Sequence, residues 1–175
     1  GVQVEMHTGE RIDLKNCSSA PRAWTLRQGI ELAAVDTNPL RMNEEHPEKS
    51  GNAWSLGSRT PEVWVDALNE ALDWIHAAIP SFYTELNVTL QRIVPVGYEP
   101  EMHLSASYRE APGTIYMTLH PSTLTLAEAI IHEVQHGKLN TLSWFDPVLH
   151  NAMSTWCDSP VRPDLRPIWG VLLAV

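Results

Sequence analysis

The stretch LAEAIIHEVQHGKLNTL, residues 126–142, places two histidines four residues apart in a segment with the apolar pattern of a helix. Thr125 and Glu128 have the spacing of a capping box, which predicts that this helix begins just after Thr125. Because 3.6 residues make one turn, His132 and His136 lie one above the other on the same helix face. Two imidazoles so placed can bind one metal ion, either tetrahedral zinc or octahedral iron. The stretch therefore predicts a metal centre.

Glu133 directly follows the first histidine and completes the pattern HExxH. Its side chain is rotated by about 100° from that of His132, so it stands beside the ion and can hold a metal-bound water rather than bind the metal. The alternative is that both histidines are surface residues of an amphipathic helix. The strand-rich segment just before the helix favours the metal centre, because zincin sites combine an edge strand that aligns a peptide with a helix that carries the ligands.

The spacing of apolar residues predicts further helices and strands on the N-terminal side of the motif. Residues 61–82 repeat apolar side chains at helical spacing, with Thr60 as N-cap and Pro61 at the first position, which predicts an amphipathic helix. Residues 103–119 predict two strands joined by the turn APG, residues 111–113. The remaining predictions are a short strand within residues 1–7, a helix within 26–35, an exposed polar loop over 38–61 and a strand at 87–98.

Together these elements predict an α+β fold of the zincin type, in which a small antiparallel or mixed sheet packs on helices. Residues 1–60 form an irregular N-terminal segment with an exposed polar loop, and residues 61–175 form the metal-binding domain, within one structural domain overall. We expect this domain to continue beyond Val175, because the final stretch IWGVLLAV, residues 168–175, stops in the middle of a predicted buried helix.

Length and composition narrow the class of protein. The 175 residues include 43% hydrophobic side chains, enough for one domain with a core. The net charge of −9 argues against nucleic acid or an anionic membrane surface as the partner. The stretch GVQVEMHTGE, residues 1–10, has no basic region followed by an apolar one, so we do not expect it to be a secretory signal. The longest apolar stretch is far short of the roughly 20 residues of a membrane span. Cys17 and Cys157 are far apart, which suits free thiols in a reducing compartment, so we expect a cytoplasmic protein.

A third metal ligand is not evident from the pattern. The metzincin arrangement requires a glycine and a histidine where this chain has Leu139 and Leu142, so that class is excluded. The gluzincin arrangement requires a carboxylate on a later helix. The later candidates all lie in proline-rich or turn-like surroundings: Asp146, Asp158, Asp164 and His150.

Two stretches of the chain resemble one family. SASYREAPGTIYMTLHPSTLTLAEAIIHEVQHGKLN, residues 105–140, and SPVRPDLRPIWGVLLAV, residues 159–175, are similar to the HEXXH motif-containing peptide-modification proteins. That family is associated with bacterial gene clusters for ribosomally made, post-translationally modified peptides. In the family, the stretch after Pro167 is typically continued by a histidine-containing helix. The resemblance therefore implies a third ligand beyond Val175.

The resemblance also implies oxidative chemistry. Some relatives are iron(II)- and 2-oxoglutarate-dependent hydroxylases that place a hydroxyl on a β-carbon of a precursor peptide. Such an enzyme must anchor the distal carboxylate of 2-oxoglutarate, usually with an arginine fork, and Arg162 and Arg166 are the candidates. The alternative is that both arginines pair with acidic residues in a surface loop. Tyr108, Arg109 and Glu110, predicted on the strand before the motif helix, are candidates for contact with the substrate.

The sequence is compatible with three functions. The first is iron(II)- and 2-oxoglutarate-dependent hydroxylation of a ribosomally made precursor peptide, with the iron held by His132 and His136. The second is a zinc metallopeptidase, in which Glu133 is the general base. The third is a peptide-binding module without catalysis. In each case the partner is a peptide, and the sequence leaves the oligomeric state open.

Overall fold

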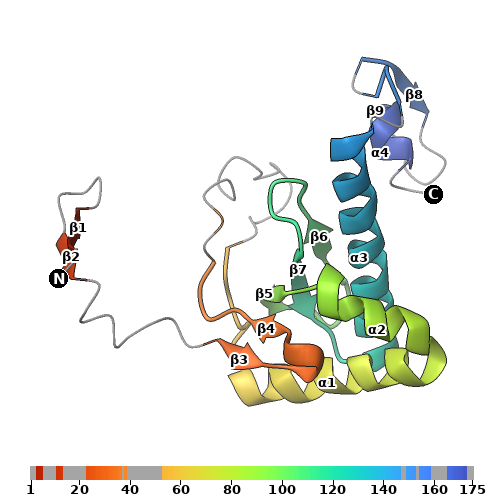
Figure 1. Ribbon diagram of the computed structural model, residues 1–175. Coiled ribbons are helices and arrows are strands. Elements are labelled where there is room, and N and C mark those ends of the chain that lie inside the picture. The colour runs from red at the N-terminus through yellow and green to blue at the C-terminus, as the bar shows by residue number, and fades with distance from the viewer. Residues whose placement is uncertain are drawn as a thin grey trace.

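The computed structural model places helices and strands along most of the chain (Figure 1). It describes residues 3–5 and 11–13 by their backbone, and in full residues 23–36, 38, 53–146, 149–152, 154–158 and 165–172. The described helices are α1 (Pro61–Ala78), α2 (Pro80–Thr89), α3 (Thr123–Phe145) and α4 (Ile168–Leu172), with a 3₁₀ turn at Arg27–Gly29. The described strands are β1 (Gln3–Glu5), β2 (Arg11–Asp13), β3 (Trp24–Thr25), β4 (Glu31–Leu32), β5 (Arg92–Tyr98), β6 (Ser105–Ser107), β7 (Thr114–Leu119), β8 (Trp156–Asp158) and β9 (Leu165–Pro167).

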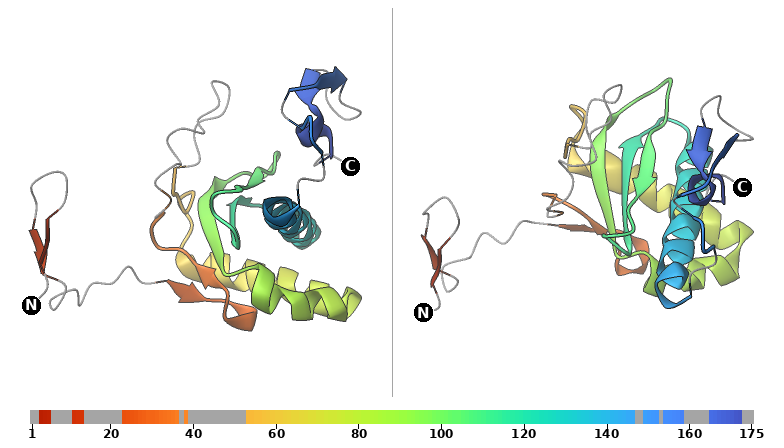
Figure 2. Two further views of the ribbon diagram at one scale, coloured as in Figure 1. Left: turned by 45° about the horizontal axis from the view of Figure 1, so that its top comes forward. Right: turned by 90° about the horizontal axis from the view of Figure 1, so that it is seen from above.

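A mixed sheet of five strands, in the order β3-β4-β5-β7-β6, forms one layer of the fold. β4, β5 and β7 are parallel, whereas β3 and β6 are antiparallel to their neighbours and form the two edges. α1, α2 and α3 pack on one face of this sheet (Figure 2). The architecture is therefore α+β, with a mixed sheet packed on helices, as the sequence predicts.

Alternation along the two central strands divides the core between the two faces of the sheet. Ile93 on β5 and Met117 on β7 face the helices and pack with Ile130 of α3 in the larger cluster. Val94 and Tyr116, each one residue away along the same strands, belong to a smaller cluster. The centre of the sheet is therefore buried on both faces. On one of them, packing against Ile93 and Met117 orients the apolar side of α3 toward the sheet.

The motif helix begins three residues earlier than the capping-box pattern predicts. Ser122 is the N-cap, because its Oγ accepts a hydrogen bond from the backbone N–H of Thr125 at 3.3 Å. Serine at this position satisfies one of the amides that the first turn leaves without a partner. The HExxH motif consequently lies in the middle of a helix of 23 residues, whose buried face includes Leu126 and Val134.

The single helix predicted over residues 61–82 is wrong, because the structure has two helices there. α1 ends at Ala78, and Pro80 opens α2 after Ile79, which has φ −138° and ψ 72°. Proline lacks an N–H and disfavours the helical conformation of the residue before it, so the helix breaks at this point.

α2 also extends into the segment predicted as a strand. It continues to Thr89, so β5 begins only at Arg92 instead of residue 87. Phe82 and Leu86 of α2 are buried at a spacing of four residues. Burial of this helical face outweighs the strand propensity of the β-branched residues that follow.

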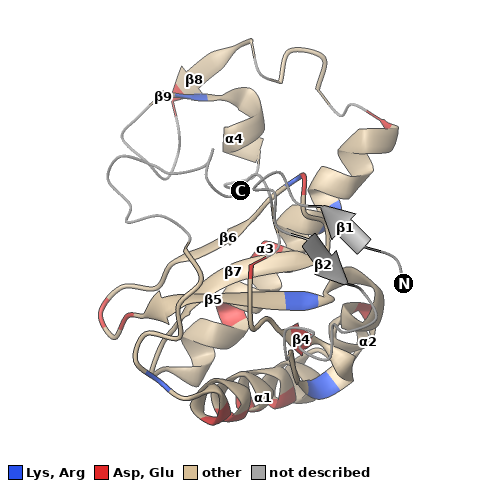
Figure 3. Ribbon diagram, turned by 90° about the vertical axis from the view of Figure 1, so that its left-hand side faces the viewer, with Lys and Arg blue, Asp and Glu red and all other residues tan. Residues whose placement is uncertain are grey.

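α1 is amphipathic, as its pattern predicts. Its outer face carries exposed acidic residues, several of which are visible in Figure 3: Glu62, Asp66, Glu70 and Asp73. The guanidinium of Arg27 pairs with Asp73 at 3.2 Å, which ties the 3₁₀ turn to α1. The opposite face of α1 is apolar and packs in the core.

The helix predicted within residues 26–35 is also wrong. Gln28 and Gly29 have φ values of 60° and 74°, which an α-helix does not allow. The chain then forms β4, and the N–H of Ala33 donates to the carbonyl of Ile93 at 2.8 Å. Long-range pairing with β5 therefore decides the conformation of this segment.

The described end of the predicted polar loop, residues 53–60, is attached to β5. The N–H of Ser55 donates to the carbonyl of Pro95 at 2.9 Å. Gly57 has φ 61°, and a Cβ at this position would lie 2.2 Å from the backbone nitrogen of Tyr98. Only glycine permits this close approach. Residues 39–52 of the predicted loop lie outside the described residues.

The two ends of the chain contain short paired strands. β1 pairs with β2, which confirms the strand predicted within residues 1–7, and β8 pairs with β9 immediately before α4. Cys157 on β8 is a free thiol, whereas Cys17 lies outside the described residues. Each helix in the described part of the chain is too short or too polar to cross a membrane.

Candidate metal centre

His132, Glu133 and His136 come together on α3. Their candidate ligand atoms all lie within 4.8 Å of one another, and the two imidazole centroids are 4.1 Å apart. His132 is exposed, His136 is half-buried and Glu133 is buried. The side chains that the sequence predicts as a metal centre are therefore confirmed as one cluster of the HExxH type.

Glu133 lies against the edge strand β6. The hydroxyl of Ser105 donates to its Oε1 at 2.7 Å, and its Oε2 lies 3.6 Å from Nδ1 of His136. Burial alone would raise the pKa of the Glu133 carboxyl, but His136, Ser105 and Ser107 favour the charged form and hold this pKa below its ordinary value. The carboxylate is therefore ionised at neutral pH, directly beside the two imidazoles.

The donor atoms of the cluster fit a divalent metal ion. Two imidazoles and a carboxylate are the ligand types of zinc sites and of non-haem iron(II) sites. Oε2 of Glu133 is buried and faces His136 only at 3.6 Å, beyond hydrogen-bond distance. Buried polar atoms are normally satisfied, and a cation with its ordered water would satisfy this oxygen.

A polar cavity of about 380 Å³ opens between α3 and β6. The three side chains of the cluster line it from α3, and residues 103–107 line it from β6 and the segment before that strand. A bound group in this cavity would therefore contact the cluster and the edge strand together.

Among the described strands, β6 pairs only with β7, so its other edge, next to this cavity, is open. The N–H of Thr118 donates to the carbonyl of Leu104 at 2.9 Å, so Leu104 directs its main-chain groups toward β7. Main-chain directions alternate along an antiparallel strand, so those of Ser105 and Ser107 turn away from β7 toward the open edge. Such an edge can pair with an additional extended chain.

A second cavity, of about 620 Å³, also borders the two histidines and is mostly apolar. Its walls come from the end of α1 and from α3, and Leu172 of α4 completes them. His132 and His136 therefore stand between a polar cavity and an apolar one.

Tyr108, Arg109 and Glu110 do not lie on a strand, so this placement is corrected. They belong to the turn between β6 and β7. This turn is closed by backbone hydrogen bonds and by Gly113, which has a positive φ. The Arg109 guanidinium lies 5.5 Å from the ring centroid of Trp144. None of the three lines the polar cavity, and their contact with substrate stays a prediction.

Only one of the two candidate anchors for 2-oxoglutarate, Arg166, lies among the described residues. Arg166 lies on β9 opposite Cys157 and lines neither cavity at the histidines. Arg162 lies outside the described residues. The anchoring role of either arginine stays a prediction.

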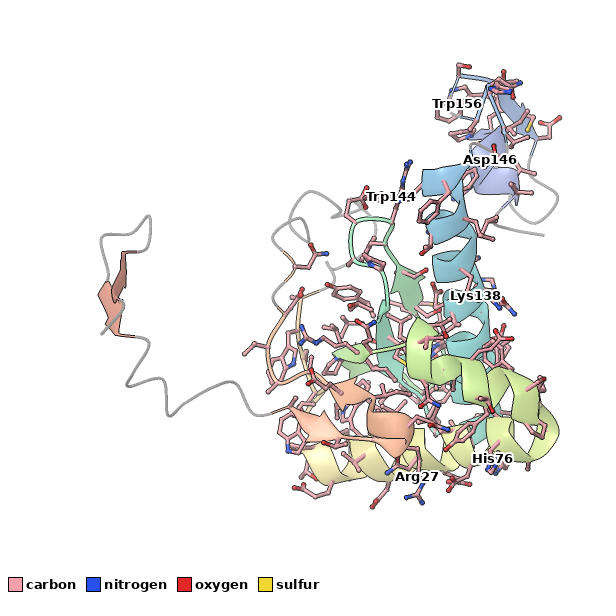
Figure 4. All side chains as sticks on the ribbon, in the orientation of Figure 1. Arg27, His76, Lys138, Trp144, Asp146 and Trp156 are labelled. Carbon is pink, nitrogen blue, oxygen red and sulfur yellow. The ribbon has the colours of Figure 1, made fainter. Side chains whose placement is uncertain are left out.

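None of the described candidates for a third ligand belongs to the cluster. Asp146 follows the C-terminal end of α3 (Figure 4), and His150 and Asp158 are exposed further along the chain. Asp164 lies outside the described residues.

His103, Ser105 and Ser107 are at the site, although the sequence patterns did not single them out. All three line the polar cavity. They are alternate residues of an extended segment, so their side chains project to the same side. The alternation of polar residues in HLSAS was the signal that could have indicated them.

The imidazole of His103 is fixed by two contacts. Its Nδ1 lies 3.3 Å from Oγ1 of Thr118, and its ring meets the ring of His120 edge-on with 6.0 Å between centroids. Burial lowers the pKa of His103, and His120 adds to this effect whereas Glu133 opposes it. The structure therefore favours the neutral imidazole.

The chain matches no protein-family model and no curated protein. Its class is defined by its fold and its site alone: an α+β protein with an HExxH-type cluster on α3 whose donor atoms can hold a metal ion.

Proposed function

We propose that the chain is a zincin-like, metal-dependent enzyme that modifies a peptide lying along β6. The observation that carries this proposal is the position of the cluster. Glu133 is hydrogen-bonded to the edge strand itself, and the polar cavity is lined by the cluster and by residues 103–107 together. A peptide that pairs with β6 would therefore lie directly beside the metal.

In this proposal α3 and β6 have different roles. His132 and His136 hold the ion through ring nitrogens. Ser105 fixes the carboxylate of Glu133, which orients the site. The outward main-chain groups of Ser105 and Ser107 hold the peptide backbone. Binding and orientation then come from β6, and the metal chemistry comes from α3.

We propose hydroxylation as the reaction. When bound, iron(II) with 2-oxoglutarate and oxygen supplies the chemistry that converts a C–H bond of the peptide into C–OH, while 2-oxoglutarate becomes succinate and carbon dioxide. The donor types of the cluster and the family resemblance of residues 105–140 support this choice. The polar cavity beside the histidines supports it as well, because a keto acid needs polar surroundings.

A zinc metallopeptidase is the second candidate, and the position of Glu133 favours it. The carboxylate is ionised and lies next to both imidazoles. From there it can accept the proton of a water that attacks a peptide carbonyl. Zinc would supply the Lewis acidity.

The decisive experiment offers the chain a library of synthetic peptides under two conditions. With iron(II), ascorbate, 2-oxoglutarate and air, a hydroxylase adds the mass of one oxygen to a peptide and releases an equal amount of succinate. With zinc and no 2-oxoglutarate, a peptidase yields two fragments instead. Peptide binding without either product would indicate the module without catalysis. The variant that replaces both His132 and His136 by alanine is the control for metal dependence.

The arginines provide a second test of the hydroxylase. Lysine keeps the charge of an arginine but loses its fork, so it binds a carboxylate less well. We expect Arg162→Lys or Arg166→Lys to raise the concentration of 2-oxoglutarate required, with little effect on peptide affinity. An arginine whose replacement leaves that requirement unchanged is not the anchor.

A further inference from the structure

His103 brings a third imidazole to the polar cavity beside β6. It does not belong to the cluster whose ligand atoms lie within 4.8 Å of one another, so in this geometry it is not a ligand to the same ion. It precedes β6 by two residues and projects to the same side as Ser105. If His103 has a function in this cavity, that function is therefore not to bind the metal.

The surroundings of His103 occupy Nδ1 and leave the other ring nitrogen, Nε2, without a hydrogen bond. Its Nδ1 faces Thr118, whose Oγ1 also accepts a hydrogen bond from the N–H of Leu104 at 3.0 Å. The neighbouring His120 is held in turn, because its Nδ1 accepts the N–H of Ser122 at 3.0 Å. A ring fixed in this way can form a further hydrogen bond only through Nε2.

Nε2 of His103 is buried and has no hydrogen-bond partner among the described residues. Ser107 and Glu133 also line the polar cavity, but there Ser107 and His136 face the Glu133 carboxylate, whereas none of the described residues offers a hydrogen bond to Nε2 of His103. Buried polar atoms without partners are uncommon, and each costs stability. A ring nitrogen without a partner beside a polar cavity indicates that the protein binds a polar group there.

We propose that His103 is a substrate-contacting residue whose Nε2 hydrogen-bonds a main-chain peptide group of the substrate. This inference rests on the proposed function, because it takes the peptide along β6 as given. The open edge at Ser105 and Ser107 brings successive peptide groups of a paired chain beside the cavity. A peptide group offers both an N–H and a C=O, so either tautomer of His103 finds a partner. The contact selects an extended backbone rather than a particular side chain.

The test compares two metal-binding probes on the cobalt(II)-loaded chain, followed through its visible spectrum. Acetohydroxamate reports on the metal alone, whereas tri-alanine hydroxamate adds a short peptide backbone. We expect the wild-type chain to bind the tripeptide probe more tightly. His103→Ala should lower this preference about three- to tenfold, the range of one hydrogen bond, and leave the affinity for acetohydroxamate unchanged.

Two further variants identify the nitrogen. The amide of glutamine reaches the position of Nε2, so His103→Gln should retain part of the preference. The amide of asparagine reaches only Nδ1, so His103→Asn should behave like His103→Ala. These two variants also carry the test if the alanine variant does not fold. His76→Ala removes a histidine that stacks on Tyr83, outside both cavities, and should change nothing.

Three outcomes would overturn the inference. An unchanged preference in His103→Ala would show that Nε2 does not meet the peptide. An equal loss of affinity for both hydroxamates would show that His103 acts on the metal site instead. A wild-type chain that binds cobalt(II) and acetohydroxamate without preferring the tripeptide probe would also exclude the contact. A wild-type chain that takes up no cobalt(II) would refute the proposed function itself.

Discussion

Ser105 on the edge strand donates a hydrogen bond to Glu133 on the motif helix, with 2.7 Å between Oγ and Oε1. This contact joins two elements that belong to different layers of the fold. It satisfies one oxygen of a buried carboxylate and directs the other oxygen toward His136. The geometry of the cluster therefore depends on the sheet as well as on the helix, and β6 takes part in both positioning the site and binding the peptide.

Replacing Ser105 by alanine tests this relationship. The buried carboxylate would lose its donor, so we expect the free energy of unfolding of the metal-free chain to fall by about 1–3 kcal/mol. Product formation from a substrate peptide should fall about 10- to 100-fold, because the carboxylate that orients the site loses its partner, whereas the metal content should not change. Urea unfolding, product formation and metal analysis measure these effects. Ser143→Ala is the control, because its hydroxyl donates to the carbonyl of Asn140 further along α3. Equal losses of activity in both variants would contradict the role of Ser105.

The two histidines should be required for metal binding. We expect the wild-type chain to bind about one divalent ion, and the variant with alanine at both His132 and His136 to bind none. His132 is exposed and His136 is half-buried, so the double variant should fold. Metal analysis after dialysis measures the change, with His76→Ala as the matched loss of one histidine. Unchanged metal content in the double variant would exclude this centre.

Glu133→Gln separates the two candidate reactions. The amide has the volume of the carboxylate but cannot accept a proton, so a peptidase should lose its turnover and keep its metal. In a hydroxylase the carboxylate only orients the site, so a partial loss of about 10- to 100-fold is expected. Product formation from a substrate peptide, together with metal content, distinguishes these outcomes. A fully active variant would show that Glu133 has neither role.

The stability of the metal-free chain should depend on pH through His103. Its pKa in the folded chain lies below the ordinary value of 6.5, so the unfolded chain binds the proton first. The free energy of unfolding should therefore be highest above about pH 6.5 and fall as the pH drops through the lower pKa of the folded chain. His120 and Glu133 face this ring and act on it in opposite senses. Urea unfolding between about pH 5 and pH 8 should show a smaller fall in His103→Gln, and an identical fall would refute the assignment to His103.

Two glycines test how residues 53–60 are held against β5. Gly29 and Gly57 both have positive φ, but a Cβ on Gly29 meets nothing within 4 Å whereas one on Gly57 would lie 2.2 Å from the Tyr98 nitrogen. Gly29→Ala should therefore cost only the conformational strain, about 1–2 kcal/mol. Gly57→Ala should cost about 1–3 kcal/mol more, because the backbone of β5 must move. Thermal or urea unfolding measures both, and equal losses would show that the contact with Tyr98 is not tight.

The sequence by itself determined the local elements with strong periods. The apolar spacing of residues 126–142 predicts α3 and places His132 and His136 on one face, because helical geometry alone brings residues four apart together. The strand pair around the turn APG follows from the same kind of local signal. The break between α1 and α2 is also a local effect, because Pro80 disfavours the helical conformation of Ile79, and the single helix predicted over residues 61–82 did not take this into account.

Only the tertiary structure decided which segments meet. Residues 26–35 have a helical pattern, yet β4 forms because its backbone pairs with β5, far away in the sequence. Likewise, nothing in the local pattern relates Ser105 to Glu133 or brings His103 beside the motif. These contacts arise when β6 packs against α3, and such packing depends on the shape of the whole core rather than on any one period. The candidate ligands could therefore be predicted from the sequence, whereas the residues that hold them in place and border the cavity could not.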